Sequence, residues 1–234
     1  MEIKNLHIIM PVKDSIDRAA EAIRALLAAG EKLTVYNDYS TAESTTQLSA
    51  LAECLHFELI NLSDLTTHPS PNYRLVLQDA QQKALAAKAH LVIVESDVVV
   101  RQDTFQKLKE QAEDRVGMVA AVTVDEAGEI NYPYDYARHW PTGVHTTKKR
   151  FSFCCTLITN ALLQAYDFRD LDPTKNWYDV FITHQSTALG FENRLMLNNA
   201  VLHRPHSSRP WKLLKYKNPI LYYWRKLTQH KDRI

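Results

Sequence analysis

Three carboxylate side chains directly follow segments that are typical of buried β-strands. Asp38 follows the strand-like run KLTVYN, and Glu95 and Asp97 follow the apolar run HLVIV. Two carboxylates two residues apart at the end of a strand can place oxygens on Mg²⁺ or Mn²⁺, and they point to the same side if the strand stays extended. The spacing predicts a divalent-cation site, with an acidic surface turn as the structural alternative.

The chain lacks the glycine-rich loops that bind phosphate in many nucleotide-binding proteins. Neither G-x-G-x-x-G nor G-x-x-x-x-G-K-[ST] occurs, and there are only 5 glycines. The absence of a G-x-S-x-G elbow likewise gives no support to a serine hydrolase. A phosphate group bound here would need positive charge from another source, and a divalent cation would supply it.

Strands and helices are expected to alternate along the first half of the chain. Apolar runs predict strands at 6–12, 32–38, 56–62, 90–100 and 116–124, and helical spacing of apolar residues predicts helices at 14–30, 40–55, 74–89 and 102–114. This alternation predicts an α/β fold with a doubly wound, mostly parallel sheet flanked by helices. Ligands bind such sheets beyond the carboxyl ends of the strands, which is where the three carboxylates are expected.

The second half of the chain is less regular. A strand is expected at 151–159, a helix at 160–166 and another helix through 180–189. Because no linker or repeat interrupts the sequence, we expect one domain over residues 1–208, followed by a basic, aromatic tail at 209–234.

Composition places the chain among ordinary soluble domains. Lys and Arg total 28 against 27 Asp and Glu, so no overall charge favours nucleic acid. No apolar run is long enough for a signal peptide or a membrane span, so a cytoplasmic location is expected. The cysteines are Cys54, Cys154 and Cys155, and an odd number with two adjacent members makes a poor disulfide framework. We therefore expect buried, reduced thiols and no zinc cluster.

Positive charge is concentrated in the tail, which is more basic than the chain as a whole. Residues 209–234 hold eight Lys or Arg and one acid, interspersed with aromatic residues. Such a segment suits an anionic membrane surface, and a solvated basic terminus or a protein-docking segment is the alternative.

Three segments of the first half resemble, in order, the motifs of one enzyme family. IIMPVKD (8–14) resembles an I-P-V-x-N first strand, VYNDYSTAEST (35–45) resembles a V-D-D-G-S-T-D-x-T turn, and IVESDV (93–98) resembles an L-D-x-D metal motif. The chain thus resembles the inverting family 2 glycosyltransferases, which have the GT-A fold and include enzymes of bacterial cell-surface polysaccharides.

The second half continues the resemblance. Trp177-Tyr178-Asp179 stands where the family has an acidic pair before its acceptor helix. Gly190 follows Asp179 by eleven residues, and His203 follows Gly190 by thirteen, as in the family. The resemblance covers about residues 4–206.

The resemblance implies metal-assisted transfer of a sugar from a nucleotide-diphosphate donor to a saccharide or lipid-linked acceptor. Asp179 would be the catalytic base that deprotonates the acceptor hydroxyl, and the cation (Mn²⁺ or Mg²⁺) would be bound by Asp97 and His203. The implied donor-binding residues are Pro11, Val12, Asp38, Glu95 and Ser96. A GT-A-like protein that binds nucleotide or a partner without turnover is the alternative, and a sugar-nucleotide pyrophosphorylase is disfavoured because PVKDSID is not its glycine-rich loop.

Substitutions within the motifs motivate that alternative. Tyr39 replaces the turn glycine, which predicts a turn that avoids positive φ there. Glu95 replaces the first aspartate of the metal motif, and Tyr178 replaces an acid beside the expected base.

Some of the implied site residues, and Asp14 beside them, could instead have purely structural roles. Asp38 and Asp179 could cap the helices that follow them, and Asp14 is expected to be the N-cap of the first helix. His203 could be a surface histidine.

Overall fold

The computed structural model describes residues 5–175, 177–204 and 218–228. The chain falls into two compact units, Met1–Arg204 and Pro205–Ile234. The described part of the first unit contains one nine-stranded sheet in the order β3-β2-β1-β4-β8-β6-β9-β5, and β7 pairs with β9 outside this path.

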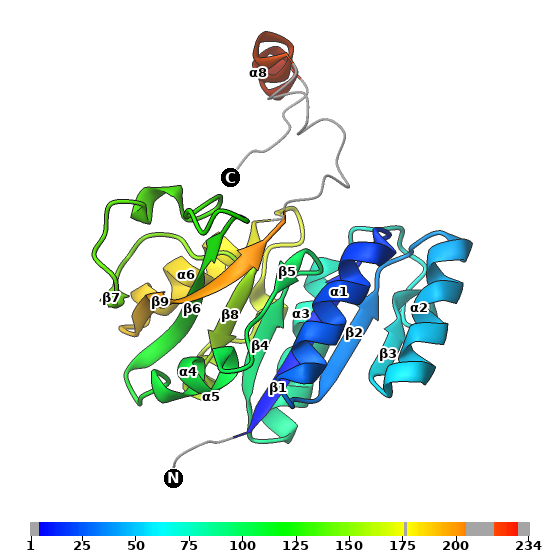
Figure 1. The fold of residues 1–234 in the computed structure, drawn as a ribbon, viewed down its shortest axis with the longest axis horizontal. Helices are drawn as coiled ribbons and strands as arrows, with labels where there is room; N and C mark the ends of the chain where they lie inside the picture. The colour runs from blue at the N-terminus through cyan, green and yellow to red at the C-terminus, as the bar shows by residue number, and fades with distance from the viewer. Residues whose placement is uncertain (1–4, 176, 205–217, 229–234) are drawn as a thin grey trace. The chain divides into compact units, whose positions relative to one another are not determined.

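The first half of the unit supplies four adjacent parallel strands (Figure 1). In chain order the elements are β1 (Leu6–Val12), α1 (Ile16–Ala28), β2 (Leu33–Asn37), α2 (Ala42–Leu55), β3 (Glu58–Asn61), the 3-10 helix η1 (Leu62–Asp64), α3 (Tyr73–Ala86) and β4 (His90–Val94). The predicted alternation of strands and helices is confirmed here. Thr41 is the N-cap of α2, and its side chain accepts a hydrogen bond from the backbone of Ser44.

The long strand predicted at 90–100 is wrong, because the chain turns at residues 95–97. The N–H of Val98 donates to the carbonyl of Glu95, which closes a tight turn. The two residues of β5 (Val98–Val99) then pair antiparallel with β9 and not with β4. The apolar run 90–100 therefore contains two strands, β4 and β5, and residues 95–97 form the turn between them.

The second half of the unit completes the sheet with strands of both directions. Its elements are α4 (Thr104–Glu110), β6 (Val116–Val124), η2 (Asp135–Ala137), β7 (Val144–Thr146), β8 (Cys155–Ile158), α5 (Asn160–Ala165), η3 (Phe168–Asp170), α6 (Tyr178–Ala188) and β9 (Glu192–His203). β8 runs antiparallel between β4 and β6, whereas β9 is parallel to β6. The sheet is therefore mostly, but not entirely, parallel.

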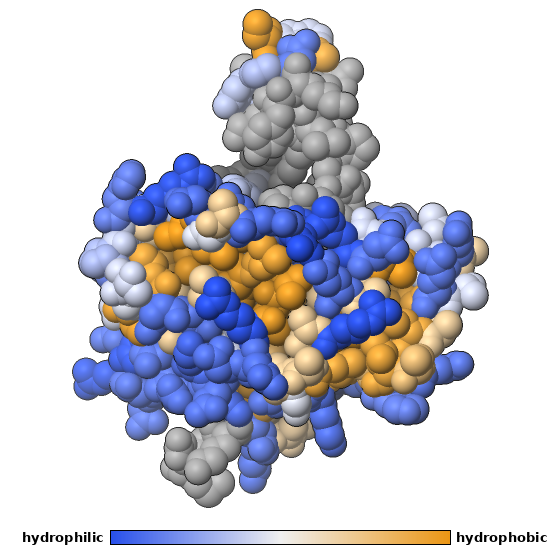
Figure 2. Space-filling view, in the orientation of Figure 1, coloured by the Kyte–Doolittle hydropathy of each residue, from blue (hydrophilic) through white to orange (hydrophobic). Residues whose placement is uncertain are grey.

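Apolar side chains cover both faces of the sheet. Along β1, Ile8 and Met10 pack in the core under α1 and α2, and Ile9 packs in the core with α3. Figure 2 shows apolar residues gathered in a band across the middle of one face, with hydrophilic residues around it. Burial on both faces explains why the strands of the first half are continuous apolar runs.

One glycine lets α6 lie close to the sheet. A Cβ on Gly117 in β6 would collide with the side chain of Ser186 in α6 and lie 2.8 Å from Cβ of Phe191. α6 carries Asp179 in its first turn, so this close approach helps to set where that carboxylate lies.

The described part of the second unit is the helix α8 (Pro219–Thr228). Ile220, Tyr223 and Trp224 are exposed on it. No helix among the described residues is long and apolar enough to cross a membrane. Residues 209–217 and 229–234 of the predicted tail lie outside the described residues.

Candidate functional site

The turn at residues 95–97 is fixed at the edge of the sheet where the parallel strands end. The N–H of Glu95 donates to the carbonyl of Cys154 at 3.1 Å, just before β8 begins. The carbonyl of Asp97 accepts from the N–H of Arg204 at 3.0 Å, just after β9 ends. β4, β8 and β9 therefore all hold this turn, although they are far apart in sequence.

His203 faces Asp97 across this turn. Its Nε2 lies 3.6 Å from Oδ2 of Asp97, and both side chains are buried. Its Nδ1 lies 2.8 Å from the carbonyl oxygen of Tyr132, which can only accept a hydrogen bond, so Nδ1 carries the proton. Nε2 is therefore the ring nitrogen that faces the carboxylate.

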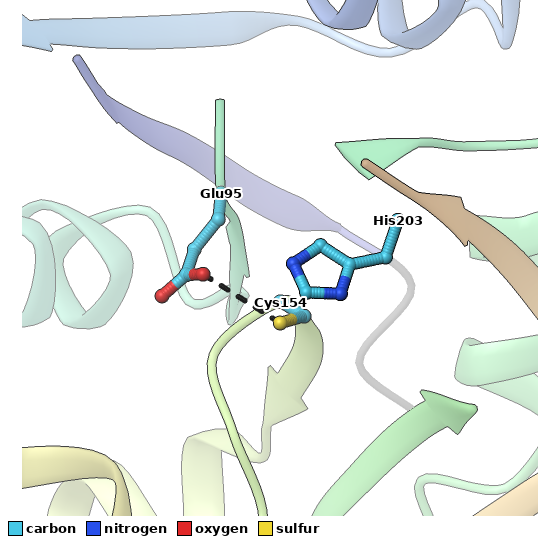
Figure 3. Close-up of side chains that lie close together, drawn as sticks. All are labelled: Glu95, Cys154 and His203. Carbon is cyan, nitrogen blue, oxygen red and sulfur yellow. Dashed lines mark hydrogen bonds between the residues drawn. The ribbon is translucent and has the colours of Figure 1, made fainter. Parts of the chain in front are cut away.

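Glu95 and Cys154 also lie close to the imidazole of His203 (Figure 3). The Cys154 thiol donates to Oε2 of Glu95 at 3.5 Å, and a carboxylate oxygen, the sulfur and a ring nitrogen of His203 all lie within 4.8 Å of one another. Sequence reasoning missed Cys154 because the thiol is adjacent to an acid and a histidine only in the fold. Cys54, Cys154 and Cys155 are free thiols as expected, but Cys54 is exposed rather than buried.

The charges at this turn perturb one another. Burial above all, together with the charges of Asp97 and Asp179 and against the opposing effect of His203, raises the pKa of Glu95 to about 7. For His203, burial alone would lower the pKa, but the hydrogen bond and charge of Asp97 outweigh it and the pKa is raised. Burial also raises the pKa of the Cys154 thiol. Negative charge is thus concentrated here, which suits a cation.

Asp179 lies in the first turn of α6, after the N-cap Trp177. Its Oδ1 accepts a hydrogen bond from the N–H of Val180 at 2.9 Å. Its charge also raises the pKa of Glu95 and of the buried Tyr73 hydroxyl, secondary to burial in each case. The charge of Asp179 therefore acts on the same buried groups as the charges of the 95–97 turn.

No protein-family model and no curated protein sequence matches the chain. Solved structures do match it. The mannosyltransferase PcManGT from Pyrobaculum calidifontis, solved with GDP-Man and Mn²⁺, matches 95% of the chain with a TM-score of 0.62 and 15% identity. Residues 1–349 of S. aureus TarS match 96% with a TM-score of 0.62 and 14% identity. GalNAc-T7, solved with UDP, GalNAc and Mn²⁺, matches 87% with a TM-score of 0.64 and 10% identity.

The chain has the GT-A fold. It spans 64%, 66% and 44% of the lengths of these three proteins, so it corresponds to about two thirds of the first two and less than half of the third. At these identities the likeness establishes the fold alone.

In this GT-A fold, Asp38 follows β2 at the same edge of the sheet. Its carboxylate accepts hydrogen bonds from Ser70 Oγ at 2.8 Å and from the backbone and side-chain nitrogens of Asn72 at 3.0 and 2.9 Å. Its own N–H donates to the carbonyl of Val12, next to Pro11 at the end of β1. Asp38 thus fixes the loop before α3, and Ser96 is buried in the neighbouring turn.

Two sequence expectations about this edge are wrong. The turn was expected to avoid positive φ at Tyr39, but Tyr39 adopts a φ of 57°. Its hydroxyl donates to the carbonyl of Thr66, and this bond holds the residue in a conformation that favours glycine. The N-cap of α1 is Ser15, not Asp14. Oδ1 of Asp14 instead accepts from the N–H of Thr41 at 2.8 Å, which links the end of β1 to the start of α2.

Proposed function

We propose that the chain transfers a sugar from a nucleotide-diphosphate donor to an acceptor hydroxyl, assisted by a divalent cation. The cation is held by Asp97 and His203, and Asp179 is the catalytic base. The observation that carries the proposal is the buried pair formed by Asp97 and His203 at the carboxyl edge of the sheet.

The donor set of this pair fits Mn²⁺ or Mg²⁺. The carboxylate oxygen suits either ion, the imidazole nitrogen is a ligand of divalent transition metals, and neighbouring ligands of an octahedral ion lie about 3 Å apart. Oδ2 of Asp97 and Nε2 of His203 are 3.6 Å apart, so a small adjustment brings both onto one ion. The hydrogen bond from Nδ1 to Tyr132 orients the imidazole as second-shell partners of metal-binding histidines do.

A bound cation would stabilise the negative charge that develops on the departing diphosphate. The remaining donor contacts are assigned to the ends of β1, β2 and β4. Pro11 and Val12 would line the pocket of the nucleotide base and Asp38 would bind its polar edge. Glu95 and Ser96 would lie near the ribose.

Asp179 would remove the proton from the acceptor hydroxyl as the oxygen attacks the anomeric carbon. A sugar hydroxyl is a poor nucleophile, and a carboxylate within hydrogen-bond reach activates it. Attack from the face opposite the diphosphate inverts the anomeric configuration. The influence of Asp179 on the pKa of Glu95 supports its nearness to the donor residues.

The solved structures support a nucleotide-sugar donor, because PcManGT was solved with GDP-Man and Mn²⁺ and GalNAc-T7 with UDP, GalNAc and Mn²⁺. TarS was also solved with UDP. The order of the motifs along the chain further favours family 2 and the biosynthesis of a bacterial cell-surface polysaccharide.

We further propose a saccharide or lipid-linked acceptor and a location in the cytoplasm at the inner face of the membrane. The exposed Ile220, Tyr223 and Trp224 of α8 stand within the basic segment 209–234, a combination that binds anionic lipid surfaces. Cosedimentation with anionic vesicles checks this proposal. The variant with Ile220→Gln and Trp224→Gln should stay in solution, and pelleting equal to that of the parent would contradict it.

A thermal-shift screen tests the proposed function. UDP, GDP, dTDP and CMP are each added with Mn²⁺, Mg²⁺ or EDTA, because a ligand that binds only the folded protein raises its melting temperature. We expect a shift with one diphosphate that EDTA removes. A shift that survives EDTA would refute the metal role of Asp97 and His203, and no shift with any nucleotide would refute the proposal.

A further inference from the structure

The thiol of Cys154 has no part in the proposed transfer. It lies beside the carboxylate of Glu95 and the imidazole of His203, and both kinds of group bind metal ions. Glu95 directly follows β4, Cys154 directly precedes β8, and His203 is the last residue of β9 (Figure 3). Their three ligand atoms lie within 4.8 Å of one another. Cys154 and His203 are buried, and Glu95 is half-buried.

We propose that Glu95, Cys154 and His203 form a second ligand set, which binds a thiophilic divalent ion of the Zn²⁺ class in competition with the harder cation at Asp97 and His203. The ligand set itself is independent of the proposed transfer reaction. Its effect on nucleotide binding rests on the proposed function.

The geometry suits a tetrahedral ion. With bonds of about 2.0–2.3 Å from zinc to oxygen, nitrogen and sulfur, neighbouring ligand atoms lie about 3.3–3.8 Å apart. The sulfur of Cys154 and Oε2 of Glu95 are already 3.5 Å apart. The imidazole nitrogen lies no more than 4.8 Å from either atom, so it must close by at most about 1.5 Å, which a side-chain rotation provides.

The donor atoms favour this class of ion over Mg²⁺ and Mn²⁺. A thiolate is a soft ligand that selects zinc and similar metals, whereas carboxylates suit the harder ions. On binding, the thiol gives up its proton to solvent as the sulfur–metal bond forms, with no change of oxidation state. The ion gains one thiolate, one imidazole and one carboxylate, each of which is a ligand that zinc binds in proteins.

His203 belongs to both sets, so the two ions exclude each other. Nδ1 is engaged by the carbonyl of Tyr132, which leaves Nε2 as the one ring nitrogen for either ion. An ion drawn toward Cys154 takes this nitrogen away from Asp97. Zn²⁺ would therefore displace Mn²⁺ and weaken the binding of a diphosphate that requires Mn²⁺.

Cobalt(II) titration of the whole 234-residue chain tests the ligand set. A sulfur bound to Co²⁺ gives a charge-transfer band in the near ultraviolet, and oxygen and nitrogen ligands alone do not. We expect the band in the parent and in Cys54→Ser, which removes only the exposed thiol, with saturation at one ion per chain and loss of the band on addition of Zn²⁺. Cys154→Ser should lack the band. If circular dichroism shows that the serine variant is misfolded, Cys154→Ala takes its place and should also lack the band.

A band that persists in folded Cys154→Ala, or no band in the parent, would overturn the proposal. A second measurement compares, within each variant, the Mn²⁺-dependent nucleotide shift with and without Zn²⁺. Zn²⁺ should abolish most of the shift in the parent and in Cys54→Ser, and a larger share should survive in Cys154→Ala. An equal loss in all three would refute the competition.

The two proposals fail separately. A cobalt–thiolate band without any nucleotide shift would leave the ion site standing and refute the transfer function. A nucleotide shift without the band would refute the ion site and leave the transfer function standing.

Discussion

Asp97→Asn should remove most of the metal-dependent stabilisation by nucleotide. The substitution keeps the shape of the side chain but removes the charge that faces His203 at 3.6 Å. Loss of a second-shell partner alone costs about 10–100-fold in metal affinity, so loss of a direct ligand should cost at least about 100-fold. With ligand at 100 times its Kd the parent gains about 2.7 kcal/mol, and a 100-fold loss leaves about 0.4 kcal/mol.

These energies translate into a clear difference in melting temperature. One kcal/mol corresponds to about 2–4 °C for a chain of this size. The shift with Mn²⁺ and the preferred diphosphate should therefore fall from about 5–11 °C in the parent to about 1–2 °C in Asp97→Asn.

The exposed Asp103, which forms a salt bridge with Lys107, offers a matched control. Asp103→Asn should keep the full nucleotide shift of the parent. An equal shift in Asp97→Asn and the parent at the same ligand concentrations would refute the reasoning.

Three further substitutions give distinct readouts. Asp179→Asn should keep donor binding and lose most transfer, because a base acts on turnover more than on ground-state affinity; an unchanged kcat in steady-state assays would contradict this. Gly117→Ala should lower the free energy of unfolding by about 1–3 kcal/mol, because the new Cβ collides with α6. An unchanged midpoint in urea unfolding would show that α6 moves away at no cost. Asp38→Asn should lower the free energy of unfolding by about 1–3 kcal/mol, because the Asp38 carboxylate accepts hydrogen bonds from Ser70 and from both nitrogens of Asn72. Equal stability in urea titration would mean that the loop before α3 does not depend on this charge.

The first half of the fold could be predicted because its strands are buried on both faces. β1 and β6 lie at the predicted 6–12 and 116–124. β9 was missed because ENRLMLNNAVLH alternates imperfectly and contains polar residues of low strand propensity, and its stability comes from its pairing with β6. The break in the run 90–100 was also missed, since local hydrophobicity does not reveal that β5 leaves β4 to pair with β9.

The site was only partly readable from sequence. The resemblance placed Asp97 and His203 on one cation, and the structure brings these two side chains together. Nothing in the sequence placed Cys154 beside them, because that contact depends on β8 running antiparallel to β4. The expectation for Tyr39 failed since its hydroxyl bond to Thr66 lies outside the turn motif.

The most direct test of the account is the release of nucleoside diphosphate from sugar-nucleotide donors. The 234-residue chain is assayed with Mn²⁺ and a panel of UDP-, GDP- and dTDP-sugars, with saccharide and lipid-linked acceptors. EDTA-treated protein and Asp179→Asn are assayed alongside it. The account predicts acceptor-dependent release with one donor, which EDTA abolishes and Asp179→Asn reduces strongly. Tight metal-dependent nucleotide binding without turnover of any donor would contradict it and would identify a GT-A protein that binds nucleotide without catalysis.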